Sequence, residues 1–320
     1  MSGVLVSIIT GGRPALDDRP TRLFVDSMRA AGFTDFEWVI RSDHAGAYER
    51  DDLPLNVYPV EWASDFARAH WRHPTANWQA RGFFGAFPGR EWAMQTAEDR
   101  GYDAVLQMDD NVEVIGLLNA NQPAFRSALS AGTLLHLLAE VCLSTNSYMT
   151  GAQLSSVVPK GLTALIRPGY PYSVFVERTG PGRMPYYGPF EDDIMHALEY
   201  ARHGGPHRTA AVVDVIRYNK EHKARSGGMR SAYDATRGLE ISRRYPENVR
   251  IGMGPRTSGS KDSERGVRHF LNTKGFTGVT VTDLPRFTAA AEALTAGVTA
   301  ALEAKREWDQ GKIARRAERK

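Results

Sequence analysis

An apolar stretch that ends in two carboxylates and a carboxamide constrains the fold of this chain more than any other feature. Residues 102–112 read Tyr-Asp-Ala-Val-Leu-Gln-Met-Asp-Asp-Asn-Val. Residues 105–108 suit a strand buried on both faces, as in a parallel sheet. Ligands of open α/β sheets gather at the carboxyl ends of the strands, so Asp109, Asp110 and Asn111 are expected at a ligand crevice. The alternative interpretation is a polar turn, because Asp and Asn are favoured in turns for local reasons.

These three side chains are candidate metal ligands. Carboxylate and amide oxygens are the ligands that Mg²⁺ or Mn²⁺ prefers, and such an ion usually binds together with nucleotide phosphates. His222, in a polar loop after a later strand, is a candidate fourth ligand, and a solvated histidine is the alternative. A chain with Cys142 as its single cysteine cannot form the usual thiolate clusters of zinc.

Composition and charge limit the class of protein. Of the 320 residues, 42% are hydrophobic and 24% charged, which is ordinary globular usage. One cysteine in an apolar run forms no internal disulfide and indicates a reducing compartment. The N-terminal residues lack a signal-peptide pattern and no stretch is long and apolar enough to span a membrane, so we expect a cytoplasmic protein, in a host cytoplasm if a phage encodes it.

Strand-like and helix-like segments alternate in the first 115 residues. Strands are predicted at 4–10, 36–40, 56–59 and 102–108, and helices at 21–31 and 90–100. This order predicts an open, mostly parallel, Rossmann-like sheet with right-handed crossovers, flanked by helices.

The rest of the chain continues the α/β pattern and then changes character. Strands are predicted at 157–165, 172–176 and 211–218, helices at 191–202 and 287–308, and either a helix or a strand at 134–143. We expect one domain at 1–245, in two halves (1–115 and 116–245), and a basic, partly helical C-terminal extension at 246–320.

A second acidic cluster, Glu191-Asp192-Asp193, opens the predicted helix at 191–202. Carboxylates in a first helical turn are favoured by the unpaired backbone N–H groups and the macrodipole, which is the structural explanation. The functional one rests on the preceding loop, which is rich in proline, glycine and tyrosine, including Tyr186 and Tyr187, and offers aromatic faces to a sugar or a base. A carboxylate at its rim would deprotonate an acceptor hydroxyl.

Basic and glycine-containing segments supply candidates for binding a nucleotide. Lys223, Arg225 and Arg230 flank a Ser-Gly-Gly sequence that would let the chain close over a diphosphate; a flexible basic loop is the equally supported alternative. Further candidates follow the first two strands: Thr10, Gly11, Arg13 and Asp43. Neither a dinucleotide-binding fingerprint nor a P-loop is present.

The order of these parts resembles that of GT-A glycosyltransferases. The motifs that carry the resemblance are residues 4–13, Gly89-Arg, Met108-Asp-Asp-Asn, Phe190-Glu-Asp and His222. The resemblance implies a GT-A-like catalytic domain at 1–245, with a nucleotide-binding half (1–115) and an acceptor half (116–245). It also implies that Asp43 and Arg90 contact the nucleobase and the diphosphate. Asp109 or Asp110 would contact the ribose and the metal, and His222 the metal. Asp192 would be the catalytic base of an inverting transfer, with Glu191 or Asp193 contacting the acceptor or the donor sugar. A departure from the pattern is Asn111, a neutral ligand that weakens metal binding.

Within that fold the chain resembles the TET/JBP-associated glycosyltransferases, a group encoded largely by phages. The cues are Gly89-Arg-Glu-Trp-Ala, Gln107-Met-Asp-Asp-Asn, Gly188-Pro-Phe-Glu-Asp-Asp and the basic Ser-Gly-Gly loop. The resemblance implies transfer of a sugar, with UDP-glucose as the expected donor, to a 5-hydroxymethyl pyrimidine in DNA, with 5-hydroxymethylcytosine expected. A base turned out of the duplex would stack on Trp78, Tyr186 or Tyr187.

The charge distribution agrees with a DNA acceptor. The formal net charge is +3, but residues 221–270 hold eleven Lys or Arg against six Asp or Glu, and residues 305–320 hold seven against three. Positive charge is therefore concentrated in the C-terminal third, which suits a polyanion; solvated basic helix faces and an ordinary basic tail are the equally supported alternative. The competing hypotheses are a GT-A enzyme with a carbohydrate or small-molecule acceptor, a nucleotidyltransferase, and a non-catalytic DNA-binding module.

Overall fold

A computed structural model describes residues 3–10, 20–48, 52–72, 85–155, 165–203, 205, 208–221, 238–255 and 265–317. Its strands are β1 (Val4–Ile9), β2 (Asp35–Arg41), β3 (Leu55–Tyr58), β4 (Ala104–Asp109), β5 (Val112–Leu117), β6 (Ser147–Leu154), β7 (Ile166–Pro168), β8 (Val174–Arg178), β9 (Thr209–Lys220), β10 (Val249–Pro255) and β11 (Arg265–Leu271). Its α-helices are α1 (Val25–Ala30), α2 (Val60–His70), α3 (Phe87–Asp99), α4 (Ala124–Ser127), α5 (Ala131–Leu143), α6 (Asp192–His203), α8 (Leu239–Arg244) and α9 (Leu284–Ala317), with 3-10 turns η1 (Pro20–Phe24) and η2 (Ser42–Ala47).

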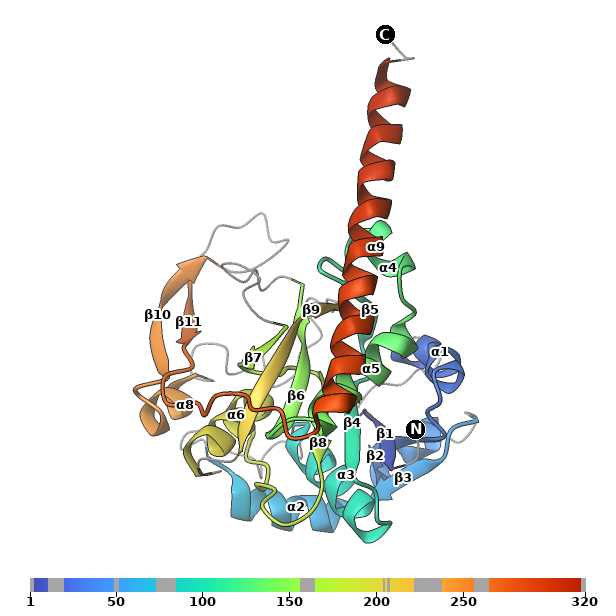
Figure 1. Cartoon of the computed structure of the whole chain (residues 1–320). Coiled ribbons are helices and arrows are strands. Elements are labelled where there is room, and N and C mark those ends of the chain that lie inside the picture. Colours follow the sequence, from blue (N-terminus) through green and yellow to red (C-terminus); the bar gives the residue numbers. More distant parts are fainter. Residues whose placement is uncertain are drawn as a thin grey trace.

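A nine-stranded sheet forms the centre of the molecule, in the order β3-β2-β1-β4-β8-β6-β9-β5 with β7 beside β9 (Figure 1). The strands β3, β2, β1 and β4 run parallel to one another. Alternate residues of β1 belong to two different hydrophobic clusters. Val4, Val6 and Ile8 pack on one face of the sheet, and Leu5 and Ile9 pack on the other. The predicted α/β fold, with a sheet covered on both faces by helices, is confirmed.

The second half of the sheet mixes directions. β8 lies antiparallel to both β4 and β6, whereas β6 and β9 are parallel and β5 returns antiparallel to β9. The segment at 134–143, for which the sequence favoured neither type, is part of the helix α5, whose first turn is capped by Ser130 accepting from the Thr133 N–H. Most of the strand predicted at 157–165 lies outside the described residues.

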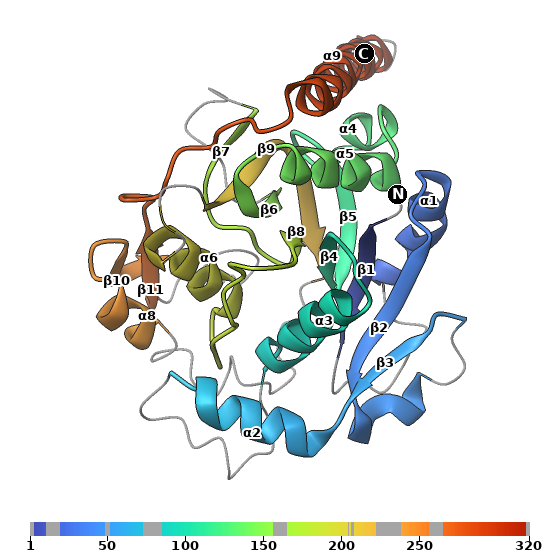
Figure 2. The same cartoon turned by 60° about the horizontal axis from the view of Figure 1, so that its bottom comes forward.

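Helices cover the two faces of the sheet in two groups (Figure 2). α2, α3 and α6 lie on one face, and α1, α5 and α9 on the other. β10 and β11 form a separate antiparallel pair beside α8. The predicted helix at 21–31 is present as η1 followed by α1, while α2, β5 and β6 were not predicted.

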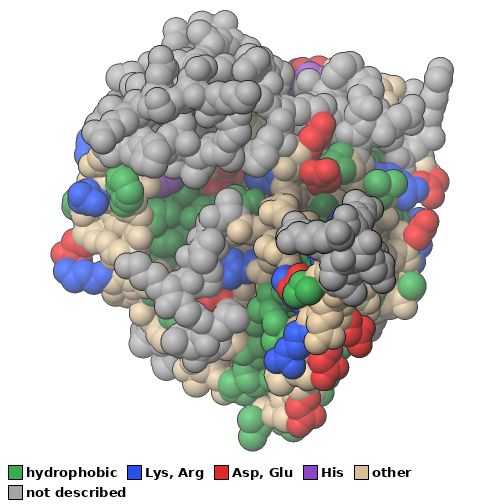
Figure 3. All heavy atoms as spheres, turned by 90° about the horizontal axis from the view of Figure 1, so that it is seen from above, with side chains coloured by type: hydrophobic (Ala, Val, Ile, Leu, Met, Phe, Trp, Pro, Cys, Tyr) green, Lys and Arg blue, Asp and Glu red, His purple; other side chains and the backbone are tan. Residues whose placement is uncertain are grey.

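The helix α9 packs on the body with only its first part. Ala290, Leu294 and Ala301 are buried, and α9 contacts α4 and α5, but its far end extends beyond the body (Figure 1). On the face from which it projects, acidic and basic side chains of the described residues are interspersed (Figure 3). Within the described part of the chain, no helix has both the length and the apolar character required to cross a membrane.

Candidate functional site

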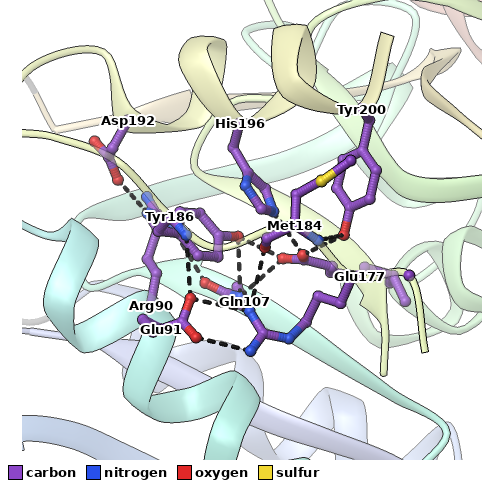
Figure 4. Close-up of polar contacts among 12 residues, drawn as sticks. Arg90, Glu91, Gln107, Glu177, Met184, Tyr186, Asp192, His196 and Tyr200 are labelled. Carbon is purple, nitrogen blue, oxygen red and sulfur yellow. Dashed lines mark hydrogen bonds and ion pairs between the residues drawn. The ribbon is translucent and has the colours of Figure 1, made fainter. Parts of the chain in front are cut away.

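Arg90 joins the two acidic clusters that the sequence singled out. Its Nη2 donates to Asp109 Oδ1 at 2.7 Å and its Nε to Asp192 Oδ2 at 2.8 Å. Asp109 ends the buried strand β4, and Asp192 begins α6. Arg90 lies in the first turn of α3 and is only 2% exposed, so its charge is held in place by packing (Figure 4). The fold thus brings together two clusters that are far apart in the chain.

Lys220, at the end of β9, completes this cluster and was not predicted as a site residue. Its Nζ donates to Asp109 Oδ2 at 2.9 Å and to the Ser173 hydroxyl. Each oxygen of the Asp109 carboxylate therefore has a cationic donor. The sequence feature that could have indicated it is a lysine at the end of an apolar strand rich in β-branched residues, two residues before His222, which was predicted as a site residue instead.

The charges of this cluster set the protonation of its carboxyl groups. Burial disfavours the charged form of Asp109, but Lys220 and Arg90 outweigh burial and hold its pKa well below the usual range. For Asp192, burial together with the negative charge of Asp109 prevails over Arg90, so its pKa is raised. Burial and the neighbouring Asp192 raise the pKa of Asp193 to about 7.

Thr10 and Asp110 meet at the same edge of the sheet, after the adjacent strands β1 and β4. The Thr10 hydroxyl donates to Asp110 Oδ2 at 2.7 Å and lies 2.6 Å from the Tyr48 hydroxyl. Because Thr10 has one hydroxyl hydrogen, Tyr48 is the donor in the second bond. Asp43 lies in η2, half-exposed, and accepts two bonds from Arg41, at 2.6 and 2.8 Å.

Backbone strain is concentrated at this site. Ser173 and Glu191 have φ angles of 50° and 51°, in the left-handed region that favours glycine. The Ser173 carbonyl accepts from the Asp109 N–H at 2.8 Å, and Glu191 directly precedes Asp192. Non-glycine residues in this conformation cost on the order of 1 to 3 kcal/mol each and cluster at functional sites.

A buried polar network lies beside Arg90 (Figure 4). Glu177, on β8, accepts from the Tyr186 hydroxyl, from Tyr200 at 2.8 Å and from His196 Nε2 at 2.6 Å. Gln107 connects this network to the site, because its Oε1 accepts from Arg90 Nη1 at 3.4 Å and its Nε2 donates to Tyr186 at 3.2 Å. The network ties α6, which carries His196 and Tyr200, to the sheet.

The two predicted acceptor tyrosines lie in different settings. Tyr186 is fully buried within that network, so its ring presents no face to an acceptor in this structure. Tyr187 is half-buried, and the guanidinium of Arg72 lies 4.4 Å from its ring centre. Burial of Tyr186 has a physical reason: its hydroxyl is one of the donors that compensate the buried carboxylate of Glu177.

The described residues do not fit a divalent metal ion at Asp109. Both oxygens of that carboxylate bind cationic side chains. Asn111 donates its Nδ2 to the Glu221 carbonyl at 3.4 Å, a bond that does not involve the Oδ1 atom a metal would use. In the described part of the chain, no three His, Cys, Asp or Glu side chains are grouped as metal ligands. The predicted ligand His222 lies outside the described residues, as do six further predicted site residues: Gly11, Arg13, Trp78, Lys223, Arg225 and Arg230.

No protein-family model matches the sequence, and no curated protein matches it. Among solved structures, the chain is similar to glucosyl-3-phosphoglycerate synthase from Mycobacterium tuberculosis in complex with Mn²⁺, UDP and glucosyl-3-phosphoglycerate. The identity is 8% and the TM-score 0.43, over 84% of this chain and 88% of that one. The same synthase with Mn²⁺, UDP-glucose and phosphoglyceric acid gives 10% identity and a TM-score of 0.43, over 78% and 84%. A structure described as a mycobacterial protein gives 10% and 0.44, over 83% of each chain.

Proposed function

We propose that this protein is a glycosyltransferase that moves a sugar from a nucleotide-sugar, with UDP-glucose as the expected donor, to a 5-hydroxymethyl pyrimidine in DNA. The single observation that carries the proposal is the ion-pair cluster in which Arg90 binds Asp109 and Asp192. It unites the acidic end of a central strand with the acidic start of α6, as transfer from a donor to an acceptor hydroxyl requires.

The donor would bind at the carboxyl ends of β1 and β4, where Thr10 and Asp110 meet. The described carboxylates there outnumber the cations, because Asp109, Asp192 and Asp193 all act on Arg90, and Glu191 adds a further negative charge beside Asp193, whereas the described cations are Arg90 and Lys220. A nucleoside diphosphate is itself anionic and needs further positive charge nearby. Lys223, Arg225 and Arg230 follow β9 in sequence, and we assign them to the leaving diphosphate.

Asp192 would take the proton of the acceptor hydroxyl. Arg90 orients its carboxylate through Nε, and a raised pKa brings the group closer to the neutral range in which a general base is efficient. Asp193, which follows it on α6, would contact the sugar or the acceptor, as would Glu191. Mn²⁺ or Mg²⁺, the cofactor that the resemblance implies, would require ligands beyond the described residues.

The test is mass spectrometry of nucleosides from DNA containing hydroxymethylcytosine, after incubation with the protein and a panel of nucleotide-sugars. A hexose-sized mass gain on the modified base is expected. Release of a nucleoside diphosphate without that gain would keep the transferase and overturn the DNA acceptor in favour of a small or carbohydrate one. Release of pyrophosphate from nucleotides would identify a nucleotidyltransferase instead.

A further inference from the structure

We infer that Lys220, together with Arg90, forms a protein-borne cation site for the donor's diphosphate, in the place beside Asp109 where a divalent ion was expected. The inference deepens the proposed function and rests on it. It assigns a role to Lys220, a residue that neither the acidic motifs nor the basic Ser-Gly-Gly loop singled out.

The first support is the geometry around Asp109. Arg90 Nη2 is 2.7 Å from Oδ1, and Lys220 Nζ is 2.9 Å from Oδ2. A metal ion on this carboxylate would stand next to two positive charges, which repel it, whereas a phosphate oxygen beside Lys220 Nζ would accept a charge-assisted hydrogen bond. The ion pairs of Arg90 and Lys220 thus already supply the charge compensation that a metal gives to such a carboxylate.

The second support is that the two cations differ in access to solvent. The Arg90 side chain is 2% exposed and is held on its other side by Asp192. The Lys220 side chain is 27% exposed, close to the 22% of Asp109. Arg90 therefore acts as a fixed internal charge, and Lys220 is the cation that a bound ligand reaches.

The third support is the number of N–H donors of the Lys220 ammonium group that are already in use. An ammonium group has three N–H donors, and among the described residues Asp109 and Ser173 use two of them. Ser173 is held in a left-handed backbone conformation (φ 50°), directly before β8, where its hydroxyl meets the ammonium. This strained serine and the carboxylate fix the Nζ atom and leave one N–H for a phosphate oxygen.

The experiment is calorimetric titration of UDP into the full-length protein, once with EDTA and once with Mn²⁺. We expect wild-type protein to bind UDP in EDTA with a Kd within about threefold of that in Mn²⁺. Lys220→Met should weaken binding in EDTA by about tenfold or more, the loss of one charge-assisted bond, while Lys220→Arg should keep most of it. The matched control is Lys274→Met, an exposed lysine beside Glu247, which should leave binding unchanged.

A second measurement avoids substitution, in case Lys220→Met does not fold. UDP in EDTA should protect Lys220 of the wild-type protein from an amine-acylating reagent, read by peptide mass spectrometry, and should not protect Lys274. Binding that requires Mn²⁺, or an unprotected Lys220 in UDP-bound protein, would overturn the inference and leave the transferase intact. If no nucleoside diphosphate from a panel binds under either condition, the proposed donor fails and the inference fails with it.

Discussion

Arg90 is the residue on which the geometry of both acidic clusters depends, because its planar guanidinium binds Asp109 and Asp192 at once. Arg90→Lys replaces this fork by a single ammonium, which leaves one buried carboxylate without its partner. We expect the free energy of unfolding to fall by about 2 to 4 kcal/mol in urea denaturation. Arg68→Lys is the control, since its pair with Asp65 is exposed and should change stability by less than about 0.5 kcal/mol. Equal effects of the two substitutions would contradict the role of Arg90.

Asp193 gives the site a dependence on pH. Its pKa is raised from the usual 3.8 to about 7, first by burial and then by Asp192. The folded protein therefore holds this proton more tightly than the unfolded chain, so the group stabilises the fold below its usual pKa and that contribution is lost as the pH rises to about 7. Asp193→Asn removes the titratable group but keeps a side-chain oxygen that can accept the hydrogen bond from the Ile194 N–H, as Asp193 Oδ1 does at 2.9 Å.

We therefore expect Asp193→Asn to be more stable than the wild type at about pH 8, by on the order of 1 to 3 kcal/mol, and to lose this advantage at about pH 4. Urea denaturation of both proteins across this range measures the difference. A stability difference that does not change with pH would refute the raised pKa.

At the scale of elements, the position of α6 depends on Glu177. This carboxylate accepts from His196 and Tyr200, which lie one and two turns after Asp192 on α6. Glu177→Gln exchanges one acceptor oxygen for an NH₂ group, which then faces a donor, so we expect a loss of about 1 to 3 kcal/mol in thermal unfolding. Amide hydrogen exchange in α6 should accelerate as well. Glu113→Gln, at an exposed position of β5, should change neither measurement.

Elements whose local sequence agrees with their environment were predictable. β1 and β4 are apolar runs in a sheet buried on both faces, and α6 opens with acidic residues that suit a helix N-terminus. β6 was missed because its sequence, Ser-Tyr-Met-Thr-Gly-Ala-Gln-Leu, has no apolar run. It is a strand because β8 and β9 pair with it on either side, which is tertiary information.

Some residues of the candidate site could likewise be predicted from the sequence, and others could not. The acidic clusters and Arg90 could be named from motif order, since each lies at the junction of a strand or helix with a loop. The pairing of Lys220 with Asp109 could not, because it depends on the pairing of β9 with β5, which places Lys220 opposite Val112, three residues after Asp109. Burial of Tyr186 also escaped prediction, because its partner Glu177 is identified only by the pairing of β8 with β4.

At the scale of the whole molecule, α9 has two parts: the first packs on the core and contributes to stability, and the far part carries basic side chains. Its first part closes the core through Leu294 and Ala301, and Gly297 allows close approach to Leu129, whose Cδ1 would lie 2.5 Å from an added Cβ. Its far end extends beyond the body and includes most of the basic tail, residues 305–320. Residues 305–320 carry seven basic and three acidic side chains, so the tail is one of the two basic segments that would attract a polyanionic acceptor.

Deleting residues 304–320 tests this division. The deletion removes seven basic and three acidic side chains, so the formal net charge changes from +3 to −1 (3 − 4 = −1). We expect the Tm to change by less than about 3 °C, because the buried residues of α9 remain, and UDP affinity to stay the same. Affinity for duplex DNA, measured by fluorescence anisotropy, should fall by about tenfold or more at low salt, and the salt dependence of binding should become shallower because fewer phosphate contacts release counterions. A full-length protein that binds DNA no better than the deletion variant would exclude the tail from acceptor binding, and a large loss of Tm would place part of the core beyond residue 303.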